Sequence, residues 1–275
     1  MGKRQSWPWI VSDELWSLIE PLLPAPPPKQ VEGRPRVSDR QALCGILFVL
    51  HTGIQWEYLP QELGFGAGMT CWRRLAPLDG LERSRRLGRA SPVAVEQAAL
   101  EEPAGLVEGG DRLLPRPGRP PGPKSGPSPV DRARPGSKHH IITDGQGIPL
   151  AVSLTGGNRN DVTQLLPLLD KIPAVAGVVG RPRRRPDMLF ADRGYDHDKY
   201  RRLLRQRGIR PAIAERGQPH GTGLGTFRWV VERTISWLHG FRRLRIRWER
   251  RDDIHEAFLG LAVCLITHRH VQRLC

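Results

Sequence analysis

Two acidic residues in this chain stand where a carboxylate could act on a ligand. Asp192 directly follows residues 188–191, a short apolar run without polar alternation that predicts a strand buried on both faces of a sheet. Arg193 and Gly194 come next, so Asp192 is expected where a central strand passes into a tight loop. That edge of an open α/β sheet binds ligands, and a carboxylate there can hold a divalent metal. For the motif alone, a solvated turn acid followed by a helix cap is the simpler interpretation.

The second acid, Glu232, lies in a segment whose apolar residues recur at helical spacing. Those apolar residues share the packing side of the predicted helix, while Glu232 falls with Arg228 and Ser236 on the polar side. A helix packed against the sheet could point this carboxylate at the strand end that carries Asp192, while Arg228 and Arg233 contact phosphates. For the helix alone, an ordinary surface pair of glutamate and arginine is the simpler interpretation.

The charge of the chain indicates a polyanionic partner. Among 275 residues there are 43 Lys+Arg against 28 Asp+Glu, a formal net charge of +15. Many arginines, Arg242 and Arg243 among them, cluster near aromatic residues between positions 229 and 251, which favours nucleic acid over a membrane surface. No signal peptide is visible, and the apolar stretch at 257–266 is too short to span a bilayer. The four cysteines lack metal-ligand spacing, so we expect a cytoplasmic protein with reduced thiols.

Residues 7–75 are predicted to form a small helical domain. One helix starts near Ser12 and stops at a proline-rich stretch, and a second begins after Ser38 with an apolar face that runs to Leu50. A short third helix ends in two arginines, at positions 73 and 74. Helices joined by turns, with a basic last helix, are typical of helix-turn-helix DNA binding. A helical cap on the following domain fits the same pattern equally well.

Residues 76–137 differ in composition from the segments around them. They contain no Phe, Trp, Tyr or Ile, and their second half is dense in proline, glycine and arginine. Such a segment cannot bury enough apolar surface to offset its ordering entropy, so a disordered basic linker is the simple interpretation. A structureless connection of that length is unusual inside a compact protein.

Residues 138–270 carry the pattern of an α/β domain. Two β-rich runs, 139–143 and 150–155, flank the sequence DGQG and predict a hairpin in which Asp144 is a turn residue. A helix capped by Asn160, the strand before Asp192, further short elements and a closing apolar helix follow.

Three segments of this domain resemble a known family. HHIITDGQGIPLAVSLTGGNRNDVTQLLPLL, LFADRGYDHDKYR and RWVVERTISWLHGFRRLRIRWERRDD, in that order, resemble the DDE transposases of bacterial insertion sequences, specifically the insertion-sequence-five-like group. The resemblance covers residues 122–268, and the N-terminal VSDELWSLIEPLLP and GILFVLHTGIQWEYLPQELG resemble the helical region of that group. It implies a ribonuclease H-like mixed sheet flanked by helices, with a small N-terminal all-helical domain.

The resemblance also implies roles for individual residues. Asp192 would be the second and Glu232 the third acid of a catalytic, metal-binding triad, with two Mg²⁺ (or Mn²⁺) ions that activate a water or a 3′-hydroxyl at a phosphodiester. Two positions depart from the wider signature: Gly225 stands where many relatives have tyrosine, and His239 where many have lysine. The arginines expected to contact DNA are Arg193, Arg228, Arg233, Arg242 and Arg243.

The first acid of the triad has no clear counterpart. In the family it ends a strand N-terminal to the hairpin, in a motif of the form AVIDSSHVRA, whereas the nearest acid here is Asp111, whose glycine, arginine and proline neighbours do not favour a buried strand. Residues 105–120 permit codons that, read one base later, spell DWSRAVIDSSHVRAA. We therefore predict that about residues 76–121 were translated in a shifted frame, and that the sheet lacks its first strand.

The sequence thus predicts a transposase that cuts and rejoins double-stranded DNA at the ends of its own element. A homodimer is expected, because two ends must be brought together. The alternative is a catalytically inactive remnant that only binds DNA. A host nuclease of the same fold is a third interpretation.

Overall fold

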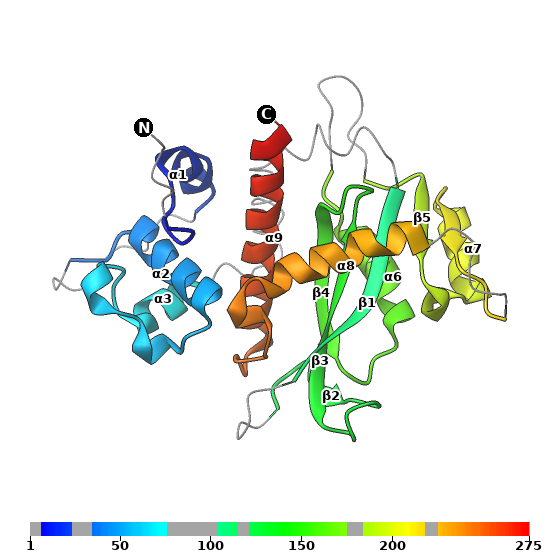
Figure 1. Ribbon diagram of the computed structural model, residues 1–275, viewed down its shortest axis with the longest axis horizontal. Coiled ribbons are helices and arrows are strands. Elements are labelled where there is room, and N and C mark those ends of the chain that lie inside the picture. The colour runs from blue at the N-terminus through cyan, green and yellow to red at the C-terminus, as the bar shows by residue number, and fades with distance from the viewer. Residues whose placement is uncertain are drawn as a thin grey trace.

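The computed structural model describes residues 7–23, 35–75, 104–114, 121–174, 184–217 and 225–274. The N-terminal part is helical, and the remainder combines one mixed sheet with helices (Figure 1). The predicted mixed α/β class is therefore confirmed. Within the described residues, none of the helices is both long enough and apolar enough to cross a membrane.

Local sequence signals explain where the N-terminal helices begin and end. Ser38 and Gln41 form a capping box at the start of the second helix, and Gly53 ends it with a left-handed φ of 74°. The apolar face of this helix is buried from Ala42 to Leu50, as its periodicity predicted. The elements of this part are α1 (Asp13–Ile19), η1 (Glu20–Leu22), α2 (Asp39–Thr52), η2 (Trp56–Tyr58), η3 (Gln61–Leu63) and α3 (Gly68–Leu75).

One six-stranded sheet forms the centre of the rest of the chain. The strands are β1 (Ala104–Leu113), β2 (Gly126–Pro127), β3 (Pro135–Thr143), β4 (Pro149–Gly156), β5 (Met188–Ala191) and β6 (Arg210–Ile213). β3 pairs antiparallel with β1 and with β4, and β5 pairs parallel with β1 and with β6. The hairpin turn predicted at Asp144 is confirmed, because its backbone N–H donates to Ile148 O and its side chain accepts from Gln146 N–H.

The strand β1 corrects the prediction that the sheet lacks its first strand. Val107 pairs with Ile142 of β3 on one edge and with Ala191 of β5 on the other, so β1 is the central strand. Its register shifts between Gly109 and Asp111, an irregularity that glycine accommodates easily. Strand formation depends on the neighbours available for pairing, and here two neighbours outweigh an unfavourable composition.

The predicted linker is also shorter than residues 76–137. Residues 121–137 are described, and they contain β2 and the first residues of β3. Residues 76–103 and 115–120 lie outside the described residues.

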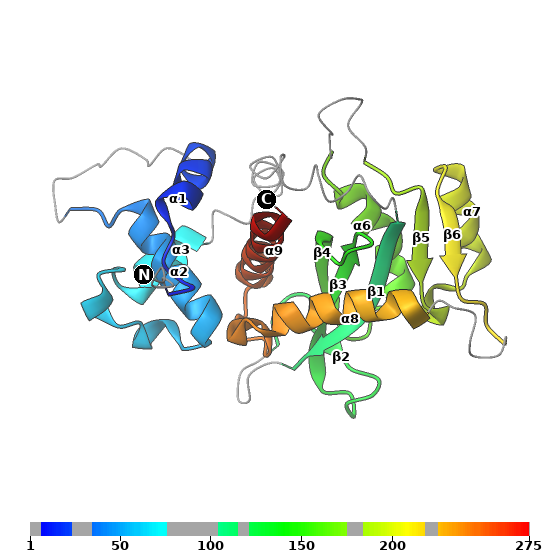
Figure 2. The same ribbon diagram turned by 45° about the horizontal axis from the view of Figure 1, so that its top comes forward.

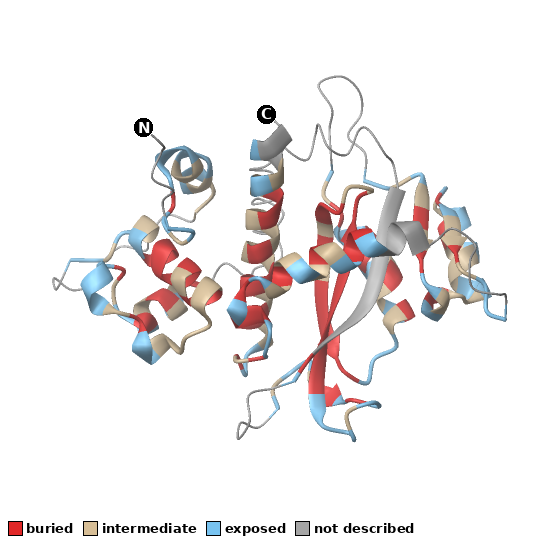
Figure 3. Ribbon diagram, in the orientation of Figure 1, coloured by how far each residue is buried: buried red, intermediate tan, exposed pale blue. Residues whose placement is uncertain are grey.

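Helices lie on both faces of the sheet (Figure 2). Ile141 joins one apolar core with α8 and α9, whereas its neighbour Ile142 joins a second core with α6 and α7, because successive strand residues point to opposite faces. Most of β3 and β4 is buried (Figure 3). The helical elements of this part are η5 (Asp161–Gln164), α6 (Leu165–Lys171), η6 (Arg193–Tyr195), α7 (Asp198–Gln206), α8 (Gly225–His239), η7 (Arg242–Leu244) and α9 (Asp252–Leu274).

Candidate active site

Asp192 lies at the end of an inner strand, as its sequence context predicted. It directly follows β5, its side chain is exposed, and its Oδ1 accepts a hydrogen bond from the Gly194 N–H at 2.8 Å. A Cβ on Gly194 would lie 3.0 Å from that same oxygen, so glycine lets the loop fold closely around the carboxylate. The Asp192 carboxylate therefore fixes the turn that follows it through the Gly194 N–H.

The loop after Asp192 is held by a second carboxylate. Asp196 accepts hydrogen bonds from Arg201 Nε and from the Arg216 backbone N–H, each at 2.8 Å. The Arg216 hydrogen bond, followed by that from Arg201, lowers the pKa of Asp196. Arg216 Nε also donates to the carbonyl of Arg193, whose side chain is half-buried. Two arginines from other elements therefore fix the backbone next to Asp192.

The register of β1 shows which residue comes next to Asp192 on the central strand. Val107 pairs with Ala191 in a parallel ladder, so positions 108 and 192 follow directly on two adjacent strands. Position 108 is a glutamate, and Asp111 lies three residues further along β1. The side chains of residues 104–112 lie outside the described part of the structure.

Glu232 lies midway along α8, which starts near β5, crosses β1 and β3, and ends near α9 (Figure 1). Val231 and Leu238 are buried as predicted, and the buried Thr234 donates its hydroxyl to Gly147 O at 2.6 Å. Glu232 is exposed, and helical spacing places it on the side of α8 opposite the buried stripe. The side chain of Arg228 lies outside the described residues.

Asp192 and Glu232 are the kind of ligand that a catalytic Mg²⁺ takes from a protein. Such an ion is usually held by one or two carboxylates together with waters and substrate phosphates. Among the residues that the structure describes, no three His, Cys, Asp or Glu side chains are grouped so that they could hold an ion. The side chains of residues 104–112, Glu108 and Asp111 among them, lie outside the described part.

The predicted DNA-binding arginines divide into inward and outward side chains. Arg233 donates to Gln146 O at 2.5 Å and lies between the rings of Trp229 and Trp237, 4.4 and 4.9 Å from their centroids. Its guanidinium fastens α8 to the hairpin turn. Arg242 is exposed and can reach a phosphate.

Arg243 does not fit the predicted phosphate contact. Its side chain is buried, with a relative exposure of 3%. It donates to Ile54 O at 2.6 Å and forms an ion pair with the buried Glu249. A phosphate could reach this guanidinium only if that ion pair were broken.

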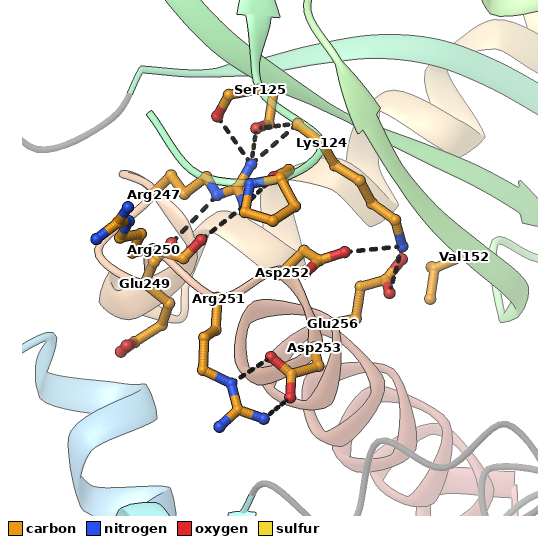
Figure 4. A network of polar contacts seen from close by, with 12 residues as sticks. Lys124, Ser125, Val152, Arg247, Glu249, Arg250, Arg251, Asp252, Asp253 and Glu256 are labelled. Carbon is orange, nitrogen blue, oxygen red and sulfur yellow. Dashed lines mark hydrogen bonds and ion pairs between the residues drawn. The ribbon is translucent and has the colours of Figure 1, made fainter. Parts of the chain in front are cut away.

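Sequence reasoning missed Arg247, which is buried as deeply as Arg243. Its guanidinium points into the loop before β2 and donates to Lys124 O at 2.9 Å and to Pro123 O at 2.5 Å (Figure 4). Lys124 in turn reaches Glu256 at 2.7 Å and Asp252 at 3.5 Å on α9. No local signal separates Arg247 from the exposed arginines beside it, because four of its six acceptor groups lie more than a hundred positions earlier in the chain.

Asp144 in the hairpin turn is a buried carboxyl group close to α8. Burial raises its pKa to about 6, although backbone hydrogen bonds from Ile148, Gln146 and Gly147 and the charge of Arg233 act in the opposite direction.

Comparison with known proteins assigns the family. Residues 112–267 match the transposase DDE domain, and residues 11–80 match a family described as transposase of the IS4/5 family. The chain is 55% identical over 199 residues to the transposase assigned to insertion sequence element IS402 of Burkholderia cepacia. The aligned segment covers 72% of this chain and 94% of that protein. It is 62% identical over 68 residues to an uncharacterized 16.2 kDa protein of the same element, which covers 24% of this chain and 46% of that protein.

The solved structures found are much less similar to this chain than these relatives are. A Mos1 transposase paired-end complex with left transposon end is 11% identical, covers 84% of this chain and 82% of that one, and has a TM-score of 0.27. A Mos1 mariner paired end complex with Mn has a TM-score of 0.26. Similarity this low supports no comparison of the folds. The DDE domain match nevertheless spans more than half of the chain, and together with the IS402 relative it establishes that this chain belongs to the DDE transposases of insertion sequences.

Proposed function

We propose that this transposase binds the double-stranded ends of its own element, cuts phosphodiester bonds there and joins the ends to target DNA. The observation that carries the proposal is the exposed carboxylate of Asp192 at the end of β5, beside the central strand, within the segment that matches the DDE domain. Ligands of open α/β sheets bind at this edge, where strands end and loops begin.

We infer that the sheet is ribonuclease H-like. Its central strand pairs with an antiparallel hairpin, β3 and β4, on one side and with the parallel strands β5 and β6 on the other. The presence of β1 N-terminal to the hairpin agrees with the resemblance, which places the first acid of the family on such a strand.

We assign the chemistry to Asp192 and Glu232 as the acids on which cleavage depends. DDE transposases generally use divalent metal ions, and such an ion stabilises the charge that develops at a phosphodiester. Carboxylates are the ligands that Mg²⁺ and Mn²⁺ prefer. Backbone register makes position 108 the place for a further donor next to Asp192.

The other residues of the site hold these acids in place. Arg233 and Thr234 bind the carbonyls of Gln146 and Gly147, and so fix the turn of α8 that carries Glu232. The Asp196 contacts fix the loop after Asp192. DNA phosphates would meet the net charge of +15, with Arg193 directly after Asp192, Arg228 on the first turn of α8 and the exposed Arg242 in η7 as contacts.

A second candidate function is DNA binding without cleavage. One observation favours it: the neighbours of Asp111, the nearest acid before the hairpin, do not match the motif that carries the first acid in the family. A chain of this kind would still hold element ends through its basic surface, as a decayed copy of an active enzyme.

A supercoiled plasmid that carries the element ends tests the proposal. With Mg²⁺ present, we expect cleavage and joining by the wild-type chain, and loss of both by Asp192→Asn and by Glu232→Gln. Asp170→Asn is the matched control, because Asp170 is an exposed carboxylate paired with Arg207 away from the strand end. Cleavage that survives the first two substitutions would refute the assignment.

Binding measured across a salt series separates the alternatives. Salt-sensitive binding with no cleavage in any variant would support the DNA-binding remnant. Cleavage with no preference for the element ends would instead indicate a nuclease. Sedimentation of the chain with two end fragments tests the expected homodimer.

A further inference from the structure

The N-terminal helices share an apolar core with the C-terminal part of the chain. Val49 and Leu50 of α2 are fully buried in the same cluster as Leu238 of α8, Phe241, and Phe258 of α9. We use the name helical unit for residues 7–75. Burial of apolar side chains from both partners provides the main non-covalent stabilisation between them.

A buried charge pair lies within this shared core. Arg243 donates to Ile54 O of the helical unit at 2.6 Å and pairs with Glu249, while Glu249 accepts from Trp56 Nε1 of the helical unit at 3.2 Å. Both charged side chains are buried, with exposures of 3% and 8%. Two groups of the helical unit are therefore needed to satisfy a charge pair of the C-terminal part, which makes the contact specific as well as apolar.

Ring contacts and a close backbone approach complete the junction. The rings of Trp56 and Phe258 are stacked with centroids 5.6 Å apart, and those of His51 and Phe241 lie 4.8 Å apart. A Cβ on Gly53 would lie 3.0 Å from the Cβ of Arg242, so the end of α2 meets η7 with no space between. Such density is typical of a stable protein interface rather than of two units joined only by a chain.

The family matches separate the same two parts of the chain. The two families found in this chain, at residues 11–80 and 112–267, do not overlap.

We propose that the surface formed by Phe241, Arg243, Glu249 and Phe258 is a docking site for the helical unit, which it holds without the covalent connection. The partner it fits is a helical unit of this sequence, whether from the same chain or supplied as a separate one. The docked unit gives the enzyme a fixed arrangement of its two parts. The contact between the two parts does not depend on whether the chain cuts DNA.

The test uses the full chain with a specific protease site inserted between residues 80 and 100. After purification and complete cleavage, we expect the two fragments to elute together in gel filtration and to remain associated on dilution. Separation of the wild-type fragments at micromolar concentration would overturn the proposal.

Substitutions at the charge pair identify the surface. Arg243→Ala leaves Glu249 buried without its ion-pair partner. We therefore expect the Kd of the cleaved fragments to rise roughly 100-fold, within the range for truncation of a buried interfacial charge. Arg250→Ala is the matched control, because the Arg250 side chain is exposed, and it should leave the affinity unchanged.

A milder variant covers the case in which Arg243→Ala does not fold. Trp56→Phe keeps an aromatic ring near Phe258 but removes the N–H that Glu249 accepts. We expect it to fold and to weaken association roughly 10-fold, as loss of a hydrogen bond to a charged group does. Equal affinities for Trp56→Phe, Arg250→Ala and wild type would refute the role of this charge pair.

Discussion

Replacement of Arg247 by lysine tests how the C-terminal segment is fixed to the sheet. Arg247 is buried, and its backbone N–H donates to Leu114 O just beyond β1. Burial lowers the pKa of its guanidinium, while the charges of Asp252 and Glu256 act in the opposite direction. The guanidinium donates to six acceptor groups: Pro123 O, Lys124 O, Ser125 Oγ, Ser137 Oγ, Glu249 O and Arg250 O.

The expected cost follows from the donors that are lost. An ammonium group has three donors and no planar fork, so lysine cannot reach all six acceptors. Each buried acceptor left without a partner costs about 1–3 kcal/mol. Ser137 Oγ donates to Lys124 O at 2.7 Å in any case and keeps part of the network intact. We therefore expect Arg247→Lys to lower the free energy of unfolding by about 2–4 kcal/mol, or Tm by roughly 5–15 °C.

Thermal unfolding followed by circular dichroism measures this effect. Arg250→Lys is the matched control, because the Arg250 side chain is exposed and only its carbonyl takes part in the network. Its Tm should stay close to that of the wild type. If Arg247→Lys also melts within about a degree of wild type, the hydrogen bonds of Arg247 do not contribute to stability as the structure indicates.

Two further predictions concern protonation and a glycine. Burial lowers the pKa of His51 and of His140 to about 4 and raises that of Asp144 to about 6. Burial also holds the pKa of His255 well below its ordinary value. Below pH 6.5 unfolding lets these three imidazoles bind protons, so stability falls with pH; Asp144 offsets part of this, and we expect a net loss of more than about 2 kcal/mol between pH 7 and pH 5 in urea unfolding. Gly53→Ala should lower the free energy of unfolding by about 2–3 kcal/mol, because Gly53 has φ +74° and its added Cβ would lie 3.0 Å from η7; Gly208→Ala, at the same φ with nothing within 4 Å, should cost only about 1 kcal/mol.

The outcomes that would contradict these predictions are specific. Stability that is flat or rises between pH 7 and pH 5 would mean that these imidazoles are not held neutral in the folded chain. Equal losses for the two glycine variants would mean that the close approach of α2 to η7 adds nothing to backbone strain.

Elements built from local signals could be predicted from the sequence. The apolar run before Asp192 gave the position of β5, and the DGQG turn gave the hairpin of β3 and β4. Helical spacing placed Val231 and Leu238 in the core and Glu232 on the surface. In each case the deciding residues lie within a few positions of one another, so the pattern contains the information needed.

The roles of the arginines could not be predicted in the same way. Arg242 and Arg243 are neighbours with the same chemistry, yet one is exposed and the other is buried against Ile54 and Glu249. Ile54 lies 189 positions from Arg243, and nothing in the basic cluster specifies that contact. Charge alone indicated DNA, and only tertiary packing shows which guanidinium groups are available to it.

The central strand β1 depends on a different kind of contact. Its ladders to β3 and β5 are backbone hydrogen bonds, which any residue except proline can form, so two neighbouring strands can pair with a segment as rich in glycine as residues 104–113. Pairing alone does not supply apolar side chains or the first acid. The prediction that residues 76–121 were translated in a shifted frame therefore remains open, and the nucleotide sequence between codons 70 and 125 tests it. If the shifted frame encodes AVIDSSHVRA, the restored chain should place apolar residues and an aspartate on this strand, and it should be both more stable and more active in cleavage than the present one.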